Sequence, residues 1–328
     1  MGDITSGNTV GTLSSPSIRI LSLDGGGTRG LSSLIVLRDL MEKVAIKKGI
    51  TQYDLIRPSE CFDLIVGTGT GGLSALLLGR LRMTVNEAIV AYQLVAKAAF
   101  QPQTIVSWAL RRSRSSLEQC LGDIIERYLN DRNAPLFDPA GDNMCRTAVL
   151  VGISANVGAP PHIFRSYASS FPTSQFTVRE VVRAVIAPAG QSSPVLLGTP
   201  PVEFISAGLV GHNNPAYVAC LEAGKIWPRS EIVCLVSLGT GLQRIVQMGG
   251  TWRKQIEACA QIMQDCENVH RTMYQRQMTS DSTSLVAFTT LILGSGHNQG
   301  LTGALLGLLL AICRSQRSLI LWILVQRY

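Results

Sequence analysis

Residues 61–74, CFDLIVGTGTGGLS, constrain the fold of this chain more than any other stretch. Their apolar run ends in a glycine-rich turn, and a helical pattern follows from Leu73. A strand, a sharp turn and a helix in this order are typical of a nucleophile elbow, in which the motif Gly-x-Ser-x-Gly lifts a serine hydroxyl above a parallel sheet. The motif here reads Gly-Thr-Gly-Thr-Gly from Gly67 to Gly71, so the vertex residue, Gly69, has no side chain.

A second glycine-rich turn lies earlier in the chain. Residues 18–24, IRILSLD, predict a strand, and the next six residues, GGGTRG, predict a turn from Gly25 to Gly30. The run that follows places its apolar residues on one face of a helix. Because the first N–H groups of a helix have no partner within it, we expect this turn to favour an anion.

Two interpretations of this turn compete. It matches the GxGxxG pattern of a dinucleotide site, which requires a second strand ending in an acidic residue near position 50. Residues 48–60 predict a loop instead, and the next strand is expected at 61–66. The other interpretation is a loop whose amides stabilise an oxyanion beside the elbow. We favour this oxyanion loop over a nucleotide site.

Strands and helices alternate along the rest of the chain, which predicts an α/β fold. Further strands are expected at 146–154, 162–167, near 205 and at 231–241. Further helices are expected at 86–100, 115–129, 177–188, from Pro215 onward and at 252–277.

Composition narrows the classes of partner. The 328 residues suit one large domain or two small ones, and a hydrophobic content of 46% supplies ample core. A net charge of +7 favours anionic partners. An aromatic content of 6%, without basic and aromatic residues interleaved, argues against a nucleic-acid platform. The eight cysteines form no CxxC pair, so we expect reduced core thiols, with no metal and no cofactor.

The distribution of polar and apolar residues divides the chain into three parts. Residues 1–17 are polar and predict a disordered leader, residues 18–278 hold the α/β domain, and residues 279–328 form an apolar tail. The tail has apolar runs at 301–312 and 319–325, each shorter than the ~20 residues that span a membrane. A buried terminal helix is one interpretation of this tail.

Three motifs in this order resemble the patatin-like phospholipase family: DGGGTRG at 24–30, GTGTGG at 67–72 and SAGLVGHNNP at 206–215. The resemblance extends from about residue 18 to residue 241, where VSLGTG is a further match. It implies a three-layer α/β/α sandwich around a mostly parallel sheet. It also implies phospholipids or other fatty acyl esters as partners. We expect a cytoplasmic protein that can contact anionic membranes at their periphery.

Family members are acyl hydrolases with a Ser–Asp dyad and an oxyanion hole made by the glycine-rich loop. Carried onto this chain, the serine falls on Gly69 and the aspartate on Ser206. The resemblance assigns the oxyanion role to Gly26, Gly27 and Arg29. The other motif residues are Gly25, Gly30, Gly67, Gly71 and Gly208.

Both dyad positions depart from the family pattern, so the resemblance predicts a domain that is catalytically dead or strongly impaired. Glycine offers no nucleophile, and a serine hydroxyl accepts no proton near neutral pH. One alternative is an active hydrolase with a relocated nucleophile, either Thr70 or Ser206 assisted by His212. Another is a non-enzymatic signalling or interaction module on the same fold. We also expect Asp24 to hold the glycine-rich loop through its amides.

Overall fold

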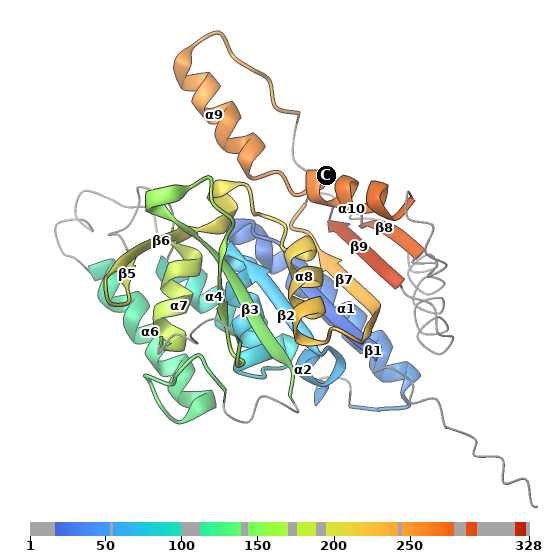
Figure 1. Ribbon diagram of the computed structural model, residues 1–328. Coiled ribbons are helices and arrows are strands. Elements are labelled where there is room, and N and C mark those ends of the chain that lie inside the picture. The colour runs from blue at the N-terminus through green and yellow to red at the C-terminus, as the bar shows by residue number, and fades with distance from the viewer. Residues whose placement is uncertain are drawn as a thin grey trace, which may run out of the picture.

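A mixed, mostly parallel sheet runs through the computed structural model of this chain (Figure 1). The structure describes residues 17–52, 55–99, 112–138, 144–169, 176–187, 195–241, 245–278, 287–293 and 319–325. The strands are β1 (Ser17–Leu23), β2 (Leu64–Thr68), β3 (Arg146–Ile153), β4 (His162–Arg165), β5 (Val195–Leu197), β6 (Val202–Ser206), β7 (Glu231–Leu238), β8 (Ala287–Leu293) and β9 (Leu319–Val325).

Strand order explains why the two glycine-rich turns meet. The order is β5-β6-β3-β2-β1-β7-β9-β8, with β4 also paired to β3. Strand β1 lies parallel to β2 and to β7, so the turns that follow β1 and β2 leave the same edge of the sheet. Strand β6 runs antiparallel to β3. Ligands of open α/β sheets bind beyond the carboxyl ends of the parallel strands, which makes this edge the place to look for a site.

Helices cover the sheet and connect its strands. The longer ones are α1 (Gly30–Lys47), α4 (Val85–Ala99), α6 (Arg112–Leu129), α7 (Val178–Ile186), α8 (Ala216–Ile226), α9 (Trp252–Met263) and α10 (Glu267–Met278). The shorter ones are η1 (Gly27–Arg29), α2 (Pro58–Cys61), α3 (Gly69–Ala75), η3 (Leu76–Arg80), η5 (Ser154–Asn156) and η6 (Ala207–Val210).

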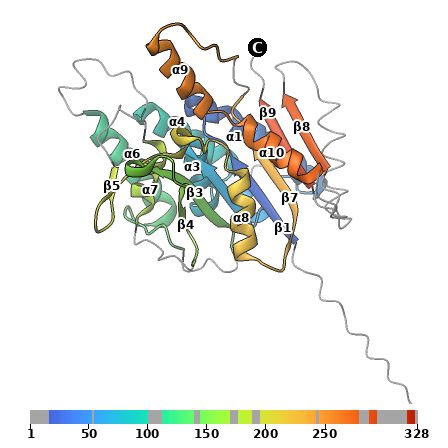
Figure 2. The same cartoon turned by 45° about the horizontal axis from the view of Figure 1, so that its top comes forward.

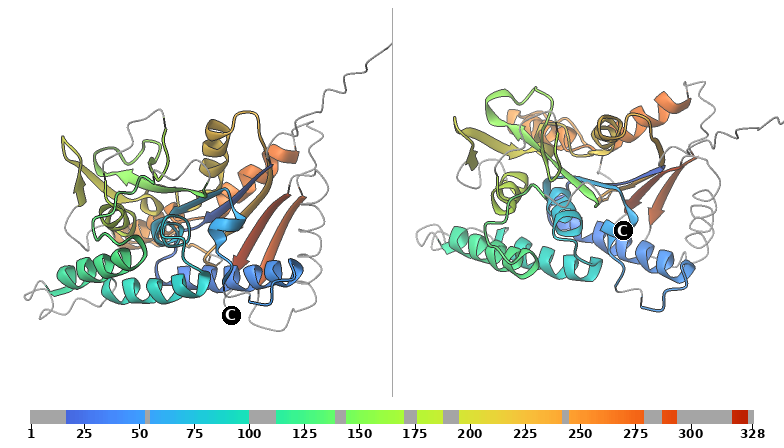
Figure 3. Two further views of the ribbon diagram at one scale, coloured as in Figure 1. Left: turned by 90° about the horizontal axis from the view of Figure 1, so that it is seen from below. Right: turned by 60° about the horizontal axis from the view of Figure 1, so that its bottom comes forward.

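The alternation of side chains along the central strands explains why helices pack on both faces of the sheet. Successive side chains of a strand point to opposite faces, so a strand buried on both sides supplies two cores. On β1, Ile18 and Ile20 join the core under α8, whereas Leu21 and Leu23 join the core under α1, α3, α4 and α7. Figure 2 shows α8 and α10 in front of the sheet, and the left view of Figure 3 shows α1, α4 and α6 along its other face. The expected three-layer α/β/α class is confirmed.

One expected helix, 252–277, is wrong in its continuity. The structure breaks it into α9 and α10. In the break between them, the Asp265 carboxylate Oδ1 accepts a hydrogen bond from the amide of Glu267, the first residue of α10, at 2.9 Å. The expectation of a loop over 48–60 also missed the short helix α2.

The ends of the chain fall largely outside the described residues. Of the expected leader only Ser17 is described, at the start of β1. The apolar run 319–325 is β9, which pairs in parallel with β7 and β8, whereas the run 301–312 lies outside the described residues. In the part of the chain that the structure describes, no helix has both the length and the apolar character needed to cross a bilayer.

Candidate functional site

The turn between β2 and α3 has the shape of an elbow. Gly69 opens α3 with a φ of 53°, in the left-handed region that favours glycine. A Cβ atom at Gly67 would overlap the Gly71 carbonyl, and one at Gly71 would overlap the Leu23 carbonyl. The motif glycines on either side of the vertex are therefore required by close backbone packing.

The structure brings the two expected dyad positions together. A Cβ atom built on Gly69 would lie 3.3 Å from the hydroxyl oxygen of Ser206 and 3.5 Å from the Cα atom of Gly25. Ser206 ends β6, whose pairing with Val151 of β3 carries it toward the elbow. A side chain at the vertex would thus point at residue 206 and lie against the glycine-rich loop.

Side chains from two distant segments hold the start of the glycine-rich loop. Gly25 donates its N–H to the Asn213 carbonyl at 3.1 Å and accepts from the Asn213 amide group at 3.3 Å. The Gly25 carbonyl also accepts from the Thr240 hydroxyl at 2.9 Å. Cβ atoms at Gly25 or Gly208 would overlap the Asn213 side chain, which explains both glycines.

The next two carbonyls of the loop are also hydrogen-bonded. The Gly27 carbonyl accepts from the hydroxyls of Thr70, at 3.1 Å, and of Tyr92. The Gly26 carbonyl accepts from Arg29 Nε at 3.3 Å. Within the described ranges, the amides of Gly26 and Gly27 donate to no other residue. These two N–H groups are consequently free to bind an anion.

The other candidate nucleophiles are placed differently. Thr70 is buried and donates its hydroxyl to the loop, so it has a structural partner. His212 hydrogen-bonds to the backbone of Ala159, and burial lowers the pKa of its imidazole. Among the described residues, no hydrogen bond joins Ser206 to His212. The structure therefore does not assemble the alternative Ser206–His212 pair.

Asp24 does not have the role that we expected. Its carboxylate is 2% exposed, its Oδ1 atom has no hydrogen-bond partner among the described residues, and its other contact is with the thiol of Cys266. Burial raises the pKa of Asp24 well above its usual range. The loop is held by Asn213, Thr240 and Tyr92 instead. No signal in the sequence indicated the role of Tyr92 in holding the loop, or the contact between Cys266 and Asp24.

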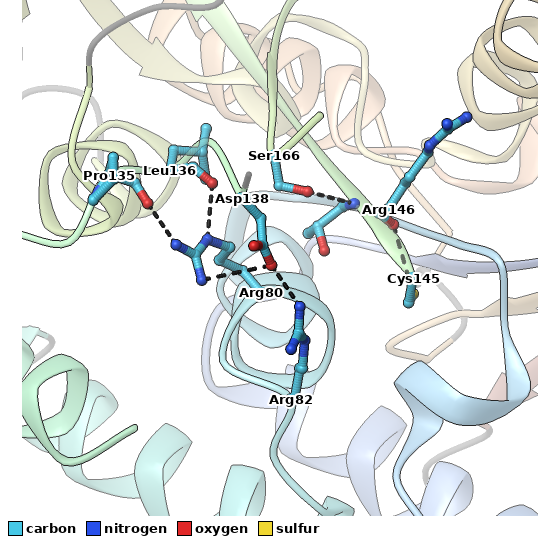
Figure 4. Close-up of polar contacts among 9 residues, drawn as sticks. Arg80, Arg82, Pro135, Leu136, Asp138, Cys145, Arg146 and Ser166 are labelled. Carbon is cyan, nitrogen blue, oxygen red and sulfur yellow. Dashed lines mark hydrogen bonds and ion pairs between the residues drawn. The ribbon is translucent and has the colours of Figure 1, made fainter. Parts of the chain in front are cut away.

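The far end of the elbow helix is anchored by two arginines (Figure 4). Helix α3 continues into η3, which ends at Arg80. The buried Arg80 guanidinium donates to the carbonyls of Leu136, at 2.9 Å, and Pro135, at 2.8 Å. Arg82 binds the Asp138 carboxylate at 2.6 Å. These contacts tie the loop before β3 to the carboxyl end of the helical segment that starts at Gly69.

Two further kinds of site would be a metal-binding cluster and a hollow outside the elbow and the glycine-rich loop. Among the described residues, no three His, Cys, Asp or Glu side chains gather in a way that could hold a metal ion. A hollow of about 320 Å³ lies beside α1, and it shares no lining residue with the elbow or the glycine-rich loop. Its lining residues are Arg38, Asp39, Met41, Glu42, Ile56, Val85 and Asn86.

Comparisons with known proteins agree with this geometry. The family described as patatin-like phospholipase matches residues 21–220. Calcium-independent phospholipase A2-gamma of Rattus norvegicus is 31% identical over 238 residues, which cover 68% of this chain and 28% of that protein. Phospholipase A I of Arabidopsis thaliana is 26% identical over 293 residues, covering 72% of this chain and 22% of that protein.

A further relative carries a different description. Probable inactive patatin-like protein 9 of Arabidopsis thaliana is 25% identical over 216 residues, covering 63% of this chain and 54% of that protein. This chain therefore spans 28% or less of the two phospholipases and about half of the protein described as inactive.

Proposed function

This chain belongs to the patatin-like phospholipase family, and from that premise we propose that its domain binds phospholipids or other fatty acyl esters without hydrolysing them efficiently. One observation carries the proposal. The vertex of the elbow is a glycine, and the group that a vertex side chain would meet, 3.3 Å from its Cβ atom, is the hydroxyl of Ser206 rather than a carboxylate.

The chemistry of ester cleavage explains why this pair of residues matters. An attacking oxygen must be present, and a neighbouring base must take its proton. Gly69 supplies no oxygen, and Ser206 supplies no base. Deleting a nucleophile of this kind costs on the order of 10⁴–10⁶ in turnover, and the remaining binding groups keep about 10³–10⁴ over water. Such a residual rate is too slow for a metabolic hydrolase.

The rest of the site supports retained binding. The carbonyls of Gly25, Gly26 and Gly27 all accept hydrogen bonds. This orients the loop so that the amides of Gly26 and Gly27 can receive an acyl carbonyl oxygen or a carboxylate. Arg29 contributes to the site by fixing the Gly26 carbonyl. We further propose that the protein acts in the cytoplasm at the membrane periphery, which its charge of +7 supports.

A ligand-induced rise in melting temperature tests the binding half of this proposal. We expect oleate and lysophosphatidylcholine to raise the melting temperature of the full chain, because a ligand that binds only the folded state stabilises it. The matched pair is Gly27→Ala and Gly49→Ala. Both glycines have positive φ, 59° and 70°, and a Cβ atom at either would meet open space. Both variants should lose similar stability, but only Gly27→Ala should lose the response to ligand.

Turnover tests the other half. We expect hydrolysis of p-nitrophenyl esters and phospholipids by the wild-type protein to equal that of a heat-denatured control. A robust rate that Gly27→Ala abolishes would contradict the proposal. So would a melting temperature that neither ligand raises.

A further inference from the structure

Helix α9 carries an apolar stripe that faces away from the protein. Trp252, Ile256, Cys259 and Met263 follow one another at intervals of four, three and four residues, which places them on one face of an α-helix. Trp252 is 73% exposed, Ile256 57% and Met263 44%, and Cys259 is exposed as well. We call these four residues the α9 stripe.

Little of α9 packs against the domain. Ala258 is its one buried residue. Figures 1 and 2 show the helix standing out from the rest of the ribbon. The segment before it adds two more exposed apolar side chains, Ile245 at 92% and Met248 at 63%.

This concentration of apolar surface is local. Six of the seventeen large apolar side chains that are exposed among the described residues lie within 245–263; besides three of the stripe residues they are Ile245, Met248 and Ile262, the last on the flank of the helix. Single exposed apolar residues are normal on a soluble protein, whereas a contiguous patch marks an interaction site. The stripe and its leading segment therefore require an occupant.

The end of α9 is hydrogen-bonded to the candidate site. The Asn213 amide group donates to the carbonyl of Gln264, one residue beyond the helix, at 2.9 Å. The same side chain donates to the Gly25 carbonyl of the glycine-rich loop, at 3.3 Å. Helix α9 also contacts η6, which begins directly after Ser206. The carboxyl end of the stripe, at Met263, therefore lies one residue from the segment that is hydrogen-bonded to the glycine-rich loop.

The charges of α9 indicate which kind of surface the stripe binds. Lys254 and Glu257 lie on the side of the helix away from the stripe, and Arg253 lies on its flank, so the charged residues of α9 outside the stripe sum to a net positive charge. A helix with an apolar face containing Trp and a cationic polar face lies in the interface of a bilayer, with its charges at the head groups. The chain as a whole carries +7, which attracts it to an anionic surface.

We infer that the α9 stripe, with Ile245 and Met248, docks the protein onto the surface of an anionic phospholipid bilayer. The docked helix brings the elbow and the glycine-rich loop to the lipid. The inference relies on the proposed function for the purpose of the contact, since a site for acyl lipids needs access to them. The contact itself is independent of whether an acyl group binds.

Vesicle flotation of the full chain tests this surface. We expect the wild-type protein to float with vesicles of phosphatidylcholine and phosphatidylserine, to bind phosphatidylcholine vesicles more weakly, and to lose binding as salt is raised. Ile256→Glu should weaken binding about tenfold or more, because it replaces an apolar side chain that would insert into the bilayer with a charged one. The matched control is Ile46→Glu on α1, where the side chain is 60% exposed and the charge change is the same. It should bind as the wild type does.

Three results would overturn the inference. The wild type could fail to float with phosphatidylserine vesicles, or Ile256→Glu could float equally well. Light scattering could also show a wild-type dimer that Ile256→Glu separates, which would make the stripe an interface between copies. The response of the melting temperature to soluble oleate separates this inference from the proposed function. Vesicle binding without a response to oleate leaves the inference standing and removes the proposed function, and the reverse result removes only the inference.

Discussion

Restoring two side chains at the elbow, Gly69→Ser together with Ser206→Asp, should convert the protein into an acyl hydrolase. The cost in stability follows from the structure. A serine at position 69 must adopt a φ of 53°, which costs roughly 1–2 kcal/mol for a residue with a Cβ atom. Its Cβ atom would lie 3.3 Å from the side chain at 206, so that neighbour must move by a few tenths of an ångström. We expect the melting temperature to fall by roughly 2–4 °C.

The gain in activity should depend on both changes. A nucleophile with its base is worth on the order of 10⁴–10⁶ in turnover, and residues that act as a unit are strongly non-additive. Gly69→Ser alone has an oxygen without a base, and Ser206→Asp alone has a base without an oxygen. Each single variant should therefore stay within about a hundredfold of the wild-type background.

Ester hydrolysis and covalent labelling measure the outcome. The double variant should hydrolyse p-nitrophenyl butyrate, and a fluorophosphonate probe should label it at position 69. Circular dichroism and a cooperative thermal transition establish that each variant is folded. A double variant that is folded, inert and unlabelled would refute the assignment of positions 69 and 206 as a nucleophile and its base.

Three further predictions concern buried polar groups. Burial raises the pKa of Asp24, so the folded state favours the protonated carboxyl and loses stability as pH rises above the ordinary pKa of 3.8. Asp24→Asn should therefore have a higher melting temperature than the wild type, by a difference that grows from about pH 4 to about pH 8. A difference that stays constant over this range would contradict this prediction. Burial alone would raise the pKa of Glu222, but the hydrogen bonds and ion pairs of its carboxylate, chiefly with Arg165, hold the pKa below 4.5. The stability that the ionised Glu222 contributes is present above pH 4.5 and is lost as pH falls through the lowered pKa. Glu222→Gln should therefore lower the free energy of unfolding by roughly 2–3 kcal/mol at pH 7 and by progressively less in acid, which denaturant titrations at several pH values can measure. Asn213→Ala removes two hydrogen bonds that join the Gly25 carbonyl to the end of α9 and should cost about 1–3 kcal/mol, with faster amide exchange in both segments; unchanged exchange would refute the link.

Local patterns were sufficient to predict the elements around the site. The strand, turn and helix at 17–47 and at 64–75 appear where apolar runs and glycines indicated them, because those glycines meet strictly local demands of turn geometry and packing. The nearness of Gly69 and Ser206 followed from the family resemblance. In the structure it results from the pairing of β6 with β3, two strands far apart in the sequence.

Features decided by tertiary contacts could not be predicted in this way. In the break between α9 and α10, the Gln264 carbonyl accepts a hydrogen bond from the side chain of Asn213, 51 residues away in the chain. The anchoring of the Gly27 carbonyl by Tyr92 likewise joins residues 65 apart. Asp24 looked like a ligand for nearby amides, but its carboxylate is turned into the interior, where it contacts Cys266.

The intact mass of the wild-type protein after exposure to a fluorophosphonate probe shows whether any hydroxyl at the elbow can attack an ester. With no activated hydroxyl at the elbow, the mass should be unchanged under conditions in which the Gly69→Ser, Ser206→Asp variant gains one adduct. A stoichiometric adduct on any serine or threonine of the wild-type domain would show that the site still attacks esters, and would contradict the account.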